Sequence, residues 1–315
     1  MQSLSVVVPC FNEEEVLRSS YEAISDVLKK MTAYETSIIF INDGSIDQTG
    51  NLLTDIAAED SSVTVLHFSR NFGHQSAVTA GIHYSDTDYV VIIDADLQDP
   101  PQLIPDMLET MLREEANVVY CVREKRAGET FLKRSTSKYF YRALNKLSEQ
   151  EFPLDTGDFR LIDRRIVEEF RRFREKGKYI RGIISWVGFK QVPFYYQRLP
   201  RYAGVTKYPW RKMLHFASTA MLYFSKKPLK VASGLGFFAV IMGVLYALWT
   251  ILGKIFGFTN AEMGWSSIIL LVVFFGGVQL LTVGVLGQYI GIIFDEVKDR
   301  PEYIIKKVDS QKIKS

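Results

Sequence analysis

The stretch VVIIDADLQDPPQ, residues 90–102, joins an unbroken apolar run to a cluster of aspartates and two prolines. Residues 90–93 are all β-branched, which is typical of a strand covered on both faces in a parallel sheet. Burying a carboxylate without a partner is costly, so the acidic residues that follow are expected at an edge of the sheet. In open α/β sheets, ligands bind outside the carboxyl ends of the strands. The pattern therefore predicts an α/β fold with a ligand site directly after this strand.

Asp94 and Asp96 lie two residues apart, so both side chains can point at one site if the chain stays extended there. Oxygen ligands suit Mg²⁺ or Mn²⁺, and these ions also share phosphate oxygens with a substrate. The spacing favours a metal–diphosphate site. The alternative is a solvated turn in which Asp99 caps the helix that follows Pro100 and Pro101.

Strands and helices alternate along the first part of the chain. Strands are predicted within 4–9, 37–45, 63–68, 88–96 and 117–123, with helical stretches between the first four. This alternation indicates βαβ units and a mostly parallel sheet. The later pattern is less regular, with a short strand and a helix in 155–170 and strand character in 189–201.

Polar residues follow each of the first four predicted strands, and clusters at successive carboxyl ends can converge on one crevice. These residues include Asn12, Glu13, Asp43, Arg70, Asn71, Asp94 and Asp96. The sequence has no GxGxxG after the first strand and no GxxxxGK[ST], which argues against dinucleotide redox chemistry and P-loop phosphoryl transfer. A carboxylate-plus-metal site remains as the way to hold a nucleotide diphosphate.

Charge is distributed unevenly along the 315 residues, although the net charge is only +2. Residues 176–261 contain no Asp or Glu, and thirteen Lys or Arg lie between Lys176 and Lys254. Such a stretch near apolar segments indicates contact with a membrane surface or an anionic ligand, and we expect no nucleic-acid partner. Cys10 and Cys121 show no metal-ligand spacing, and the N-terminus runs directly into a strand. A reduced cytosolic setting without a secretory signal peptide is expected for this part.

Two uncharged apolar stretches, 231–252 and 265–294, are long enough to span a membrane. Buried helices of a soluble domain are the alternative. Basic residues flank the pair on both sides, so the positive-inside rule places both termini in the cytoplasm and the loop 253–264 outside. The segment 208–225 mixes aromatic and basic residues, which favours an interfacial helix over an ordinary core-facing one.

Six segments together resemble the family 2 glycosyltransferases of the GT-A fold. They read VVVPCFNEEE, INDGSIDQT, SRNFGHQSA, DADLQDPP, DTGDFRLIDRR and QRLPRYAGVTKYPWRK. Within this family the chain is most similar to the bacterial polyprenyl-phosphate glycosyltransferases, which include bactoprenol glucosyltransferases and dolichyl-phosphate mannose synthases. The resemblance covers nearly all of residues 4–305. It implies a GT-A catalytic domain (1–205), an amphipathic juxtamembrane region (206–230), two transmembrane helices (231–294) and a cytoplasmic tail (295–315).

The resemblance also implies roles for individual residues. The metal, Mg²⁺ or Mn²⁺, would be held by Asp94, Asp96 and Gln98. The nucleotide pocket would be formed by Pro9, Phe11, Glu13, Asp43 and Asp94, with Arg123 on the phosphate side. The alternatives are a helix cap for Asp43 and a solvated surface position for Arg123.

Asp158 and Arg160 fall in the family's acceptor-side segment and are expected to be catalytic, together with Asp96. An alcohol acceptor would require Asp158 as a base, whereas a phosphate monoester is already largely ionised at pH 7. Asp158 would then only position the sugar or the metal, and both roles remain open. The acceptor phosphate would be bound by Arg198, Arg201 and Lys207, residues that would also attract anionic lipid.

The expected activity is inverting transfer of a hexose to undecaprenyl phosphate at the inner membrane, for cell-envelope glycan modification. Glucose from UDP-glucose is the favoured donor, with UDP-GlcNAc, UDP-galactose and GDP-mannose as alternatives. Membrane lipid, a downstream flippase and a second transferase are implied as partners, and homo-oligomerisation is left open. The competing hypotheses are a processive polysaccharide synthase, a transferase for soluble or protein acceptors, and an inactive membrane scaffold. The first would need more spans and a QxxRW signature, which the sequence lacks.

Overall fold

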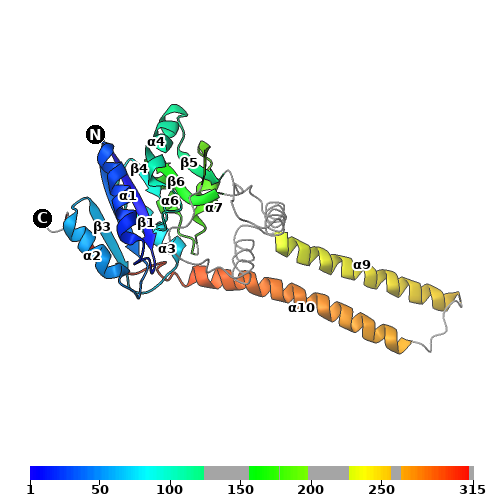
Figure 1. The fold of residues 1–315 in the computed structure, drawn as a ribbon. Coiled ribbons are helices and arrows are strands. Elements are labelled where there is room, and N and C mark those ends of the chain that lie inside the picture. Colours follow the sequence, from blue (N-terminus) through cyan, green and yellow to red (C-terminus); the bar gives the residue numbers. More distant parts are fainter. Residues whose placement is uncertain (124–155, 177, 198–226, 257–263, 312–315) are drawn as a thin grey trace. The chain divides into compact units, whose positions relative to one another are not determined.

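The computed structural model describes residues 1–123, 156–176, 178–197, 227–256 and 264–311 (Figure 1). The chain divides into two compact units. The first comprises residues 1–138, 152–207 and 300–315, and the second comprises 139–151 and 208–299. In the described residues, the first unit is an α/β domain and the second contains two long helices.

An eight-stranded mixed sheet forms the centre of the first unit, in the order β7-β5-β6-β4-β1-β2-β3-β8 (Figure 1). The strands are β1 (Gln2–Cys10), β2 (Tyr34–Asn42), β3 (Val63–Phe68), β4 (Tyr89–Ile92), β5 (Val118–Arg123), β6 (Thr156–Asp163), β7 (Gln191–Tyr196) and β8 (Ile305–Ser310). Strands β1 to β4 are mutually parallel, and β6 is antiparallel to both β4 and β5. Because β5 is parallel to β7, only β6 and β8 run against the other strands. The prediction of a mostly parallel sheet is confirmed.

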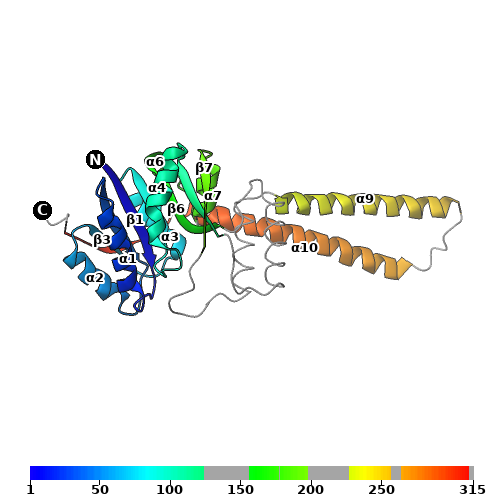
Figure 2. The ribbon, with the colours of Figure 1, turned by 45° about the horizontal axis from the view of Figure 1, so that its top comes forward.

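In the described part of the chain, three helices cover each face of this sheet (Figures 1 and 2). Helices α1 (Leu17–Lys30), α2 (Thr49–Glu59) and α4 (Ile104–Arg113) pack on one face, with the short 3₁₀ helix η1 (Pro101–Leu103) before α4. Helices α3 (His74–Tyr84), α6 (Arg164–Arg172) and α7 (Ile180–Trp186) pack on the other. Side chains alternate between the two faces along each strand, so Val6 and Val8 enter one core and Val7 the other. Burial on both faces explains why the strands are so rich in Val and Ile.

Strand β8 comes from the segment that was predicted to be a tail after the membrane helices. It pairs antiparallel with β3, with Thr64 opposite Ser310 and His67 opposite Lys307. The sequence IKKVDS has three charged residues in six, because an edge strand pairs on one side only and leaves side chains in solvent. No apolar alternation marks this strand in the sequence, and the sheet includes residues beyond 205, where the catalytic domain is predicted to end.

The second unit contains α9 (Lys227–Ile255) and α10 (Gly264–Val297). Their apolar segments, Leu229–Gly253 and Leu271–Val297, are long enough to cross a membrane, and 6% and 0% of their most hydrophobic windows are buried. A core helix of a soluble protein would be mostly buried, so this exposure favours membrane helices over that alternative. Both predicted apolar stretches fall within these helices, whereas the predicted interfacial helix 208–225 lies outside the described residues.

Candidate active site

The loop after β4 forms one side of the site. The Ile93 amide donates to the Val7 carbonyl at 3.1 Å, so the chain stays extended beside β1 as far as Asp94. It then turns at Leu97, whose φ of +56° is uncommon for a residue other than glycine. The Asp96 carboxylate accepts the Gln98 amide at 3.1 Å. Strained backbone that persists in a folded protein often marks a functional loop, and here it lies within the predicted metal motif.

Four charged side chains meet at this edge of the sheet. Nε2 of His74 lies 3.2 Å from Asp158 and 3.7 Å from Asp94. Arg181 donates to both Asp158 oxygens, from Nε at 2.7 Å and from a terminal nitrogen at 2.9 Å. The loop after β4, the start of α3, strand β6 and the start of α7 thus bring their charges into one cluster.

Strand alternation explains how Asp158 reaches this cluster. In β6, Ile162 packs in the core under α3, α6 and α7, whereas Phe159 and Leu161 pack in the opposite core. Asp158 and Ile162 are an even number of residues apart, so both side chains face α3 and α7. The two helix starts are also joined, because the Ile180 amide donates to the Gln75 side chain at 3.0 Å.

The charges in the cluster shift one another's protonation. Burial acts to lower the pKa of His74, but the contacts with Asp158 and Asp94 outweigh it and raise the pKa to about 9. Burial raises the pKa of Asp94 to about 6, with His74 opposing the shift and Asp158 and Asp96 adding to it. For Asp158, hydrogen bonds from His74 and Arg181 outweigh burial and hold the pKa well below its usual value. At neutral pH this makes His74 an imidazolium between two carboxylates.

The same cluster contains a set of metal donors. One ligand atom from each of His74, Asp94 and Asp158 lies within 4.8 Å of the others. Imidazole nitrogen and carboxylate oxygen together suit Mn²⁺, while Mg²⁺ prefers oxygen ligands alone. The donor set therefore fits a divalent cation once His74 has released its proton, since a metal-bound imidazole is neutral, and the predicted ligand Asp94 belongs to the set. The other predicted ligands, Asp96 and Gln98, lie two and four residues further along the loop.

Three of the predicted nucleotide-pocket residues lie at the end of β1 and in the loop that follows it. Pro9 is buried within β1, while Phe11 is 42% exposed and Glu13 is half-buried. Asn12, between them, has a φ of +55°, a second left-handed residue at this edge. These positions leave Phe11 accessible for contact with a base, and that role stays a prediction.

Asp43 joins the loops after β2 and β3. Its buried carboxylate accepts hydrogen bonds from the amides of Phe72 at 2.7 Å and Gly73 at 2.9 Å, and from the Asn71 side chain at 3.0 Å. The helix-cap alternative for α2 is not what the structure shows, because α2 begins only at Thr49. A side chain at Gly44, where φ is +65°, would come within 2.3 Å of the Arg70 backbone. Only glycine permits this close approach of the two loops.

Arg160 lies on β6, two residues after Asp158, and its side chain is buried. Its guanidinium donates to the carbonyls of Gly157 at 3.2 Å and Asp158 at 3.3 Å. Burial lowers its pKa to about 10, which leaves the side chain charged at neutral pH. These contacts place Arg160 in support of the Asp158 backbone.

The remaining predicted residues lie at or beyond the limits of the described chain. Arg123 ends β5 at the same sheet edge, and its side chain is not among those described. Arg198, Arg201 and Lys207 lie outside the described residues. Conversely, His74 and Arg181 were not predicted from sequence. The one signal for His74 was its place in SRNFGHQSA, directly after a glycine at the start of a helix.

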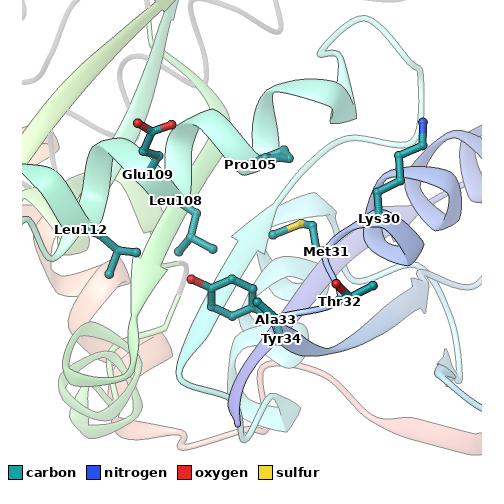
Figure 3. A pocket seen from close by; sticks show the side chains of 9 residues that line it. All are labelled: Lys30, Met31, Thr32, Ala33, Tyr34, Pro105, Leu108, Glu109 and Leu112. Carbon is teal, nitrogen blue, oxygen red and sulfur yellow. The ribbon is translucent and has the colours of Figure 1, made fainter.

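A separate hollow of about 380 Å³ lies at the opposite end of the sheet (Figure 3). It is lined by Lys30, Met31, Thr32, Ala33, Tyr34, Pro105, Leu108, Glu109 and Leu112. Tyr34 begins β2, whereas Asp43 directly follows its end, so the two regions are separated by roughly 26 Å of strand. The lining contains none of the predicted site residues.

Comparison with known proteins agrees with this fold. The model for glycosyl transferase family 2 matches residues 5–171. The chain is 46% identical over 304 residues to the uncharacterized glycosyltransferase YkcC of Bacillus subtilis (strain 168), covering 96% of this chain and 93% of that protein. It is 40% identical over 304 residues to the SfII prophage-derived bactoprenol glucosyl transferase of Shigella flexneri, covering 96% of this chain and 97% of that protein.

A solved structure shares the fold at much lower sequence identity. It is the glucosyl-3-phosphoglycerate synthase of Mycobacterium tuberculosis, crystallised with Mn²⁺, uridine diphosphate and phosphoglyceric acid. The TM-score is 0.50 at 18% identity, and the match covers 70% of this chain and 76% of that chain. This similarity concerns the GT-A fold alone. The family model and the matches over nearly the whole length of both relatives show that the chain belongs to glycosyl transferase family 2.

Proposed function

We propose that this glycosyltransferase moves a hexose from a nucleotide sugar to undecaprenyl phosphate, with inversion at the anomeric carbon. UDP-glucose is the favoured donor. The observation that carries the proposal is the pairing of Asp158 with Arg181 and His74 beside Asp94, at the carboxyl edge of the sheet. The 40% identity to a protein named bactoprenol glucosyl transferase supports the choice of acceptor and sugar.

The donor side of the reaction needs positive charge where the diphosphate departs. His74, Asp94 and Asp158 offer the described donors for a divalent cation, with Asp96 and Gln98 as further proposed ligands. When bound, such a cation neutralises the leaving diphosphate as a Lewis acid. The protein itself contributes a loop held in position by the Leu97 turn and the hydrogen bond from Gln98 to Asp96.

The acceptor side favours a nucleophile that needs no base. Both oxygens of Asp158 already accept hydrogen bonds from Arg181, and its pKa lies well below the usual value. Such a carboxylate is a weak proton acceptor at neutral pH. A phosphate monoester has its second pKa near 6 and attacks as an anion, so Asp158 need only orient groups. The geometry therefore suits a lipid phosphate better than a lipid alcohol.

The two long apolar helices would keep the enzyme at the membrane that holds a polyprenyl acceptor. In this proposal the protein is a multi-pass protein of the inner membrane, with its catalytic domain and both termini in the cytoplasm. Nucleotide sugars are available on that side. Arg198, Arg201 and Lys207 would bind the acceptor phosphate between the catalytic domain and the first span.

The test is to incubate the purified full-length protein with undecaprenyl phosphate, Mn²⁺ or Mg²⁺ and one labelled donor at a time. The donors are UDP-glucose, UDP-GlcNAc, UDP-galactose and GDP-mannose. We expect label in the lipid fraction with UDP-glucose and one sugar per lipid, which distinguishes the enzyme from a processive synthase. Undecaprenol is the matched control acceptor and should give no product. Failure with all four donors would reject the proposal in favour of an inactive scaffold.

A further inference from the structure

The segment Glu302–Ser310, here named the C-terminal strap, is part of the catalytic domain although it follows the second apolar helix in sequence. It includes β8 and is held on the sheet by main-chain pairing, extended by a hydrogen bond from the Ser69 amide to the Ile304 carbonyl at 3.0 Å. Its side chains reach the loops that form the site.

Glu302 forms a buried ion pair with Lys178. The two charges lie 3.0 Å apart, and their side chains are only 12% and 4% exposed. Lys178 also lies over the Phe170 ring, with its ammonium 5.6 Å from the ring centre. A buried pair is costly to form, and removing one partner leaves an uncompensated charge. The position of Lys178 therefore depends on Glu302.

Lys178 lies three residues before Arg181, at the entrance to α7. The first residue of α7, Ile180, is fixed to Gln75 of α3, and Arg181 follows with its two hydrogen bonds to Asp158. The guanidinium fork must meet the carboxylate with both nitrogens, so a small rotation of the helix start breaks at least one hydrogen bond. Glu302 thus lies at the start of a short chain of contacts that ends at Asp158.

Tyr303 supports the second charged partner of Asp158. Its ring stacks on Phe68, with centres 5.2 Å apart and planes 7° apart, and Phe68 meets Phe72 edge-on at 5.7 Å. Phe72 precedes Gly73 and His74, and its amide donates to Asp43. The strap therefore contacts both loops that present cations to Asp158.

The far end of the strap reaches the nucleotide side. Asp309 lies 3.2 Å from Nε2 of His67, and Nδ1 of the same ring lies 3.0 Å from the Asn42 side chain. Asn42 in turn accepts the Ser45 amide at 3.0 Å, in the loop after β2. Asn42 and His67 are buried and Asp309 is half-buried, which limits the alternative positions that these side chains can take.

We propose that Glu302 is a positioning residue of the transfer reaction, acting through Lys178 and α7 on the Arg181–Asp158 pair. The inference rests on the proposed function, since it assigns Asp158 to the reacting complex. It requires that loss of the Glu302 charge lowers kcat through Arg181. It does not require a change in KM for the nucleotide sugar, because the loop after β2 is reached by a different part of the strap.

The experiment compares Glu302→Gln with the control Glu168→Gln in the full-length protein. Glu168 pairs with Arg164 at 3.2 Å, but those side chains are 58% and 49% exposed, and exposed pairs contribute little. For Glu302→Gln we expect kcat to fall about 10- to 100-fold with KM for UDP-glucose nearly unchanged, as for other small displacements of reacting groups. The control should keep native kcat. Native kcat in Glu302→Gln would overturn the proposal.

A double-mutant cycle with Arg181→Lys separates positioning from general destabilisation. If Glu302 acts through Arg181, adding Glu302→Gln to Arg181→Lys should change kcat less than about threefold, because the two changes affect one interaction. Multiplying losses would instead show an independent structural effect and would overturn the proposal. The conservative variant Glu302→Asp should recover part of the lost kcat.

A double variant provides the test if Glu302→Gln folds poorly. Replacing both partners, as Lys178→Met with Glu302→Leu, removes the buried charges together and is expected to keep native stability. The kcat of the double variant should nevertheless stay low, because the new side chains do not hold the start of α7 where Arg181 can reach Asp158. Native kcat in this double variant would reject positioning by the ion pair.

Hydrogen exchange gives a readout that does not depend on transferase activity. Peptides from 178–186 should exchange faster in Glu302→Gln than in the native protein, while peptides from α1 should not change. A protein that makes no lipid-linked sugar yet shows this local change would defeat the proposed function and leave the Glu302–α7 coupling intact. Unchanged exchange in 178–186 would defeat the coupling whatever the activity.

Discussion

Arg181 donates two hydrogen bonds to Asp158, at 2.7 and 2.9 Å. Asp158 is the candidate general base, and both of its carboxylate oxygens therefore already accept hydrogen bonds. The pair joins β6 to α7, and His74 approaches the same carboxylate from α3 at 3.2 Å. Asp158 therefore lies between two cations, in a setting that suits orientation of substrate groups better than proton transfer.

Replacing the Arg181 guanidinium by an ammonium should reveal this role. Arg181→Lys keeps the positive charge but replaces two parallel hydrogen bonds by a single flexible ammonium. Loss of one charge-assisted hydrogen bond costs about 1.5–3 kcal/mol, and we expect a decrease in kcat of one to two decades. Steady-state transfer to undecaprenyl phosphate measures it, with Arg171→Lys on α6 as a control outside the cluster. Unchanged turnover would show that the pair is structural only.

His74 should give a characteristic pH dependence of stability. Its folded pKa of about 9 lies above the value of about 6.5 expected in an unfolded chain, so its contribution is complete below pH 6.5 and disappears as pH rises through 9. In EDTA, the Tm difference between native protein and His74→Gln should therefore shrink between pH 7 and 9.5. Thermal unfolding in detergent measures it.

His83 provides the control for that titration. Burial lowers its pKa to about 4, so the ring is neutral throughout the same range. The Tm difference between native protein and His83→Gln should therefore be constant from pH 7 to 9.5. A parallel change in both variants would trace the effect to another group.

The metal site gives a third prediction. Asp96→Asn should remove most transferase activity, and EDTA should silence the native enzyme, because the leaving diphosphate needs a counter-charge. Metal ligands must be deprotonated, and the pKa of Asp94 is raised to about 6, so activation by Mn²⁺ should weaken as pH falls through 6. Asp106→Asn, at an exposed position on α4, is the control. Full turnover after thorough metal removal would contradict the prediction.

These predictions depend on contacts that sequence reasoning reached only in part. The β-branched run 90–93 and the acidic residues after it were sufficient to predict a buried strand with a site at its end, because both signals are local. The pairing of Asp158 with Arg181 and His74 depends on how β6, α7 and α3 pack, and no local pattern encodes that. Strand β8 was missed for a related reason: its six residues carry three charges and pair on one side only.

The topology can be tested with single cysteines, since the two native thiols are buried. Eight Lys or Arg lie between Arg198 and Lys230 and six follow Phe294, whereas the loop 253–264 has one. The positive-inside rule then places that loop outside the cell and the strap inside. Thr259→Cys should react with an impermeant thiol reagent in intact cells, and Lys306→Cys, at an exposed position on β8, should react only after lysis. The reverse labelling would put the catalytic domain on the wrong side for cytosolic nucleotide sugars.

The acceptor site gives the last prediction, and it distinguishes a lipid phosphate from a lipid alcohol. Arg201 belongs to a stretch without acidic residues that leads to the first span, where it is expected to bind a phosphate at the membrane surface. Arg201→Ala should raise KM for undecaprenyl phosphate by about one to two decades, the equivalent of one lost charge-assisted hydrogen bond. The KM for UDP-glucose should hardly change. The matched control is Lys190→Ala, at an exposed position directly before β7.

Asp158→Asn completes this test. If Asp158 orients groups around an acceptor that is already ionised, the variant should retain measurable transfer, because Asn keeps one hydrogen-bond acceptor for Arg181. If Asp158 were the base for an alcohol, the same change would abolish transfer, and the native enzyme would use undecaprenol. Equal turnover of undecaprenol and undecaprenyl phosphate by the native protein would therefore refute the phosphate acceptor and, with it, the positioning role of Asp158.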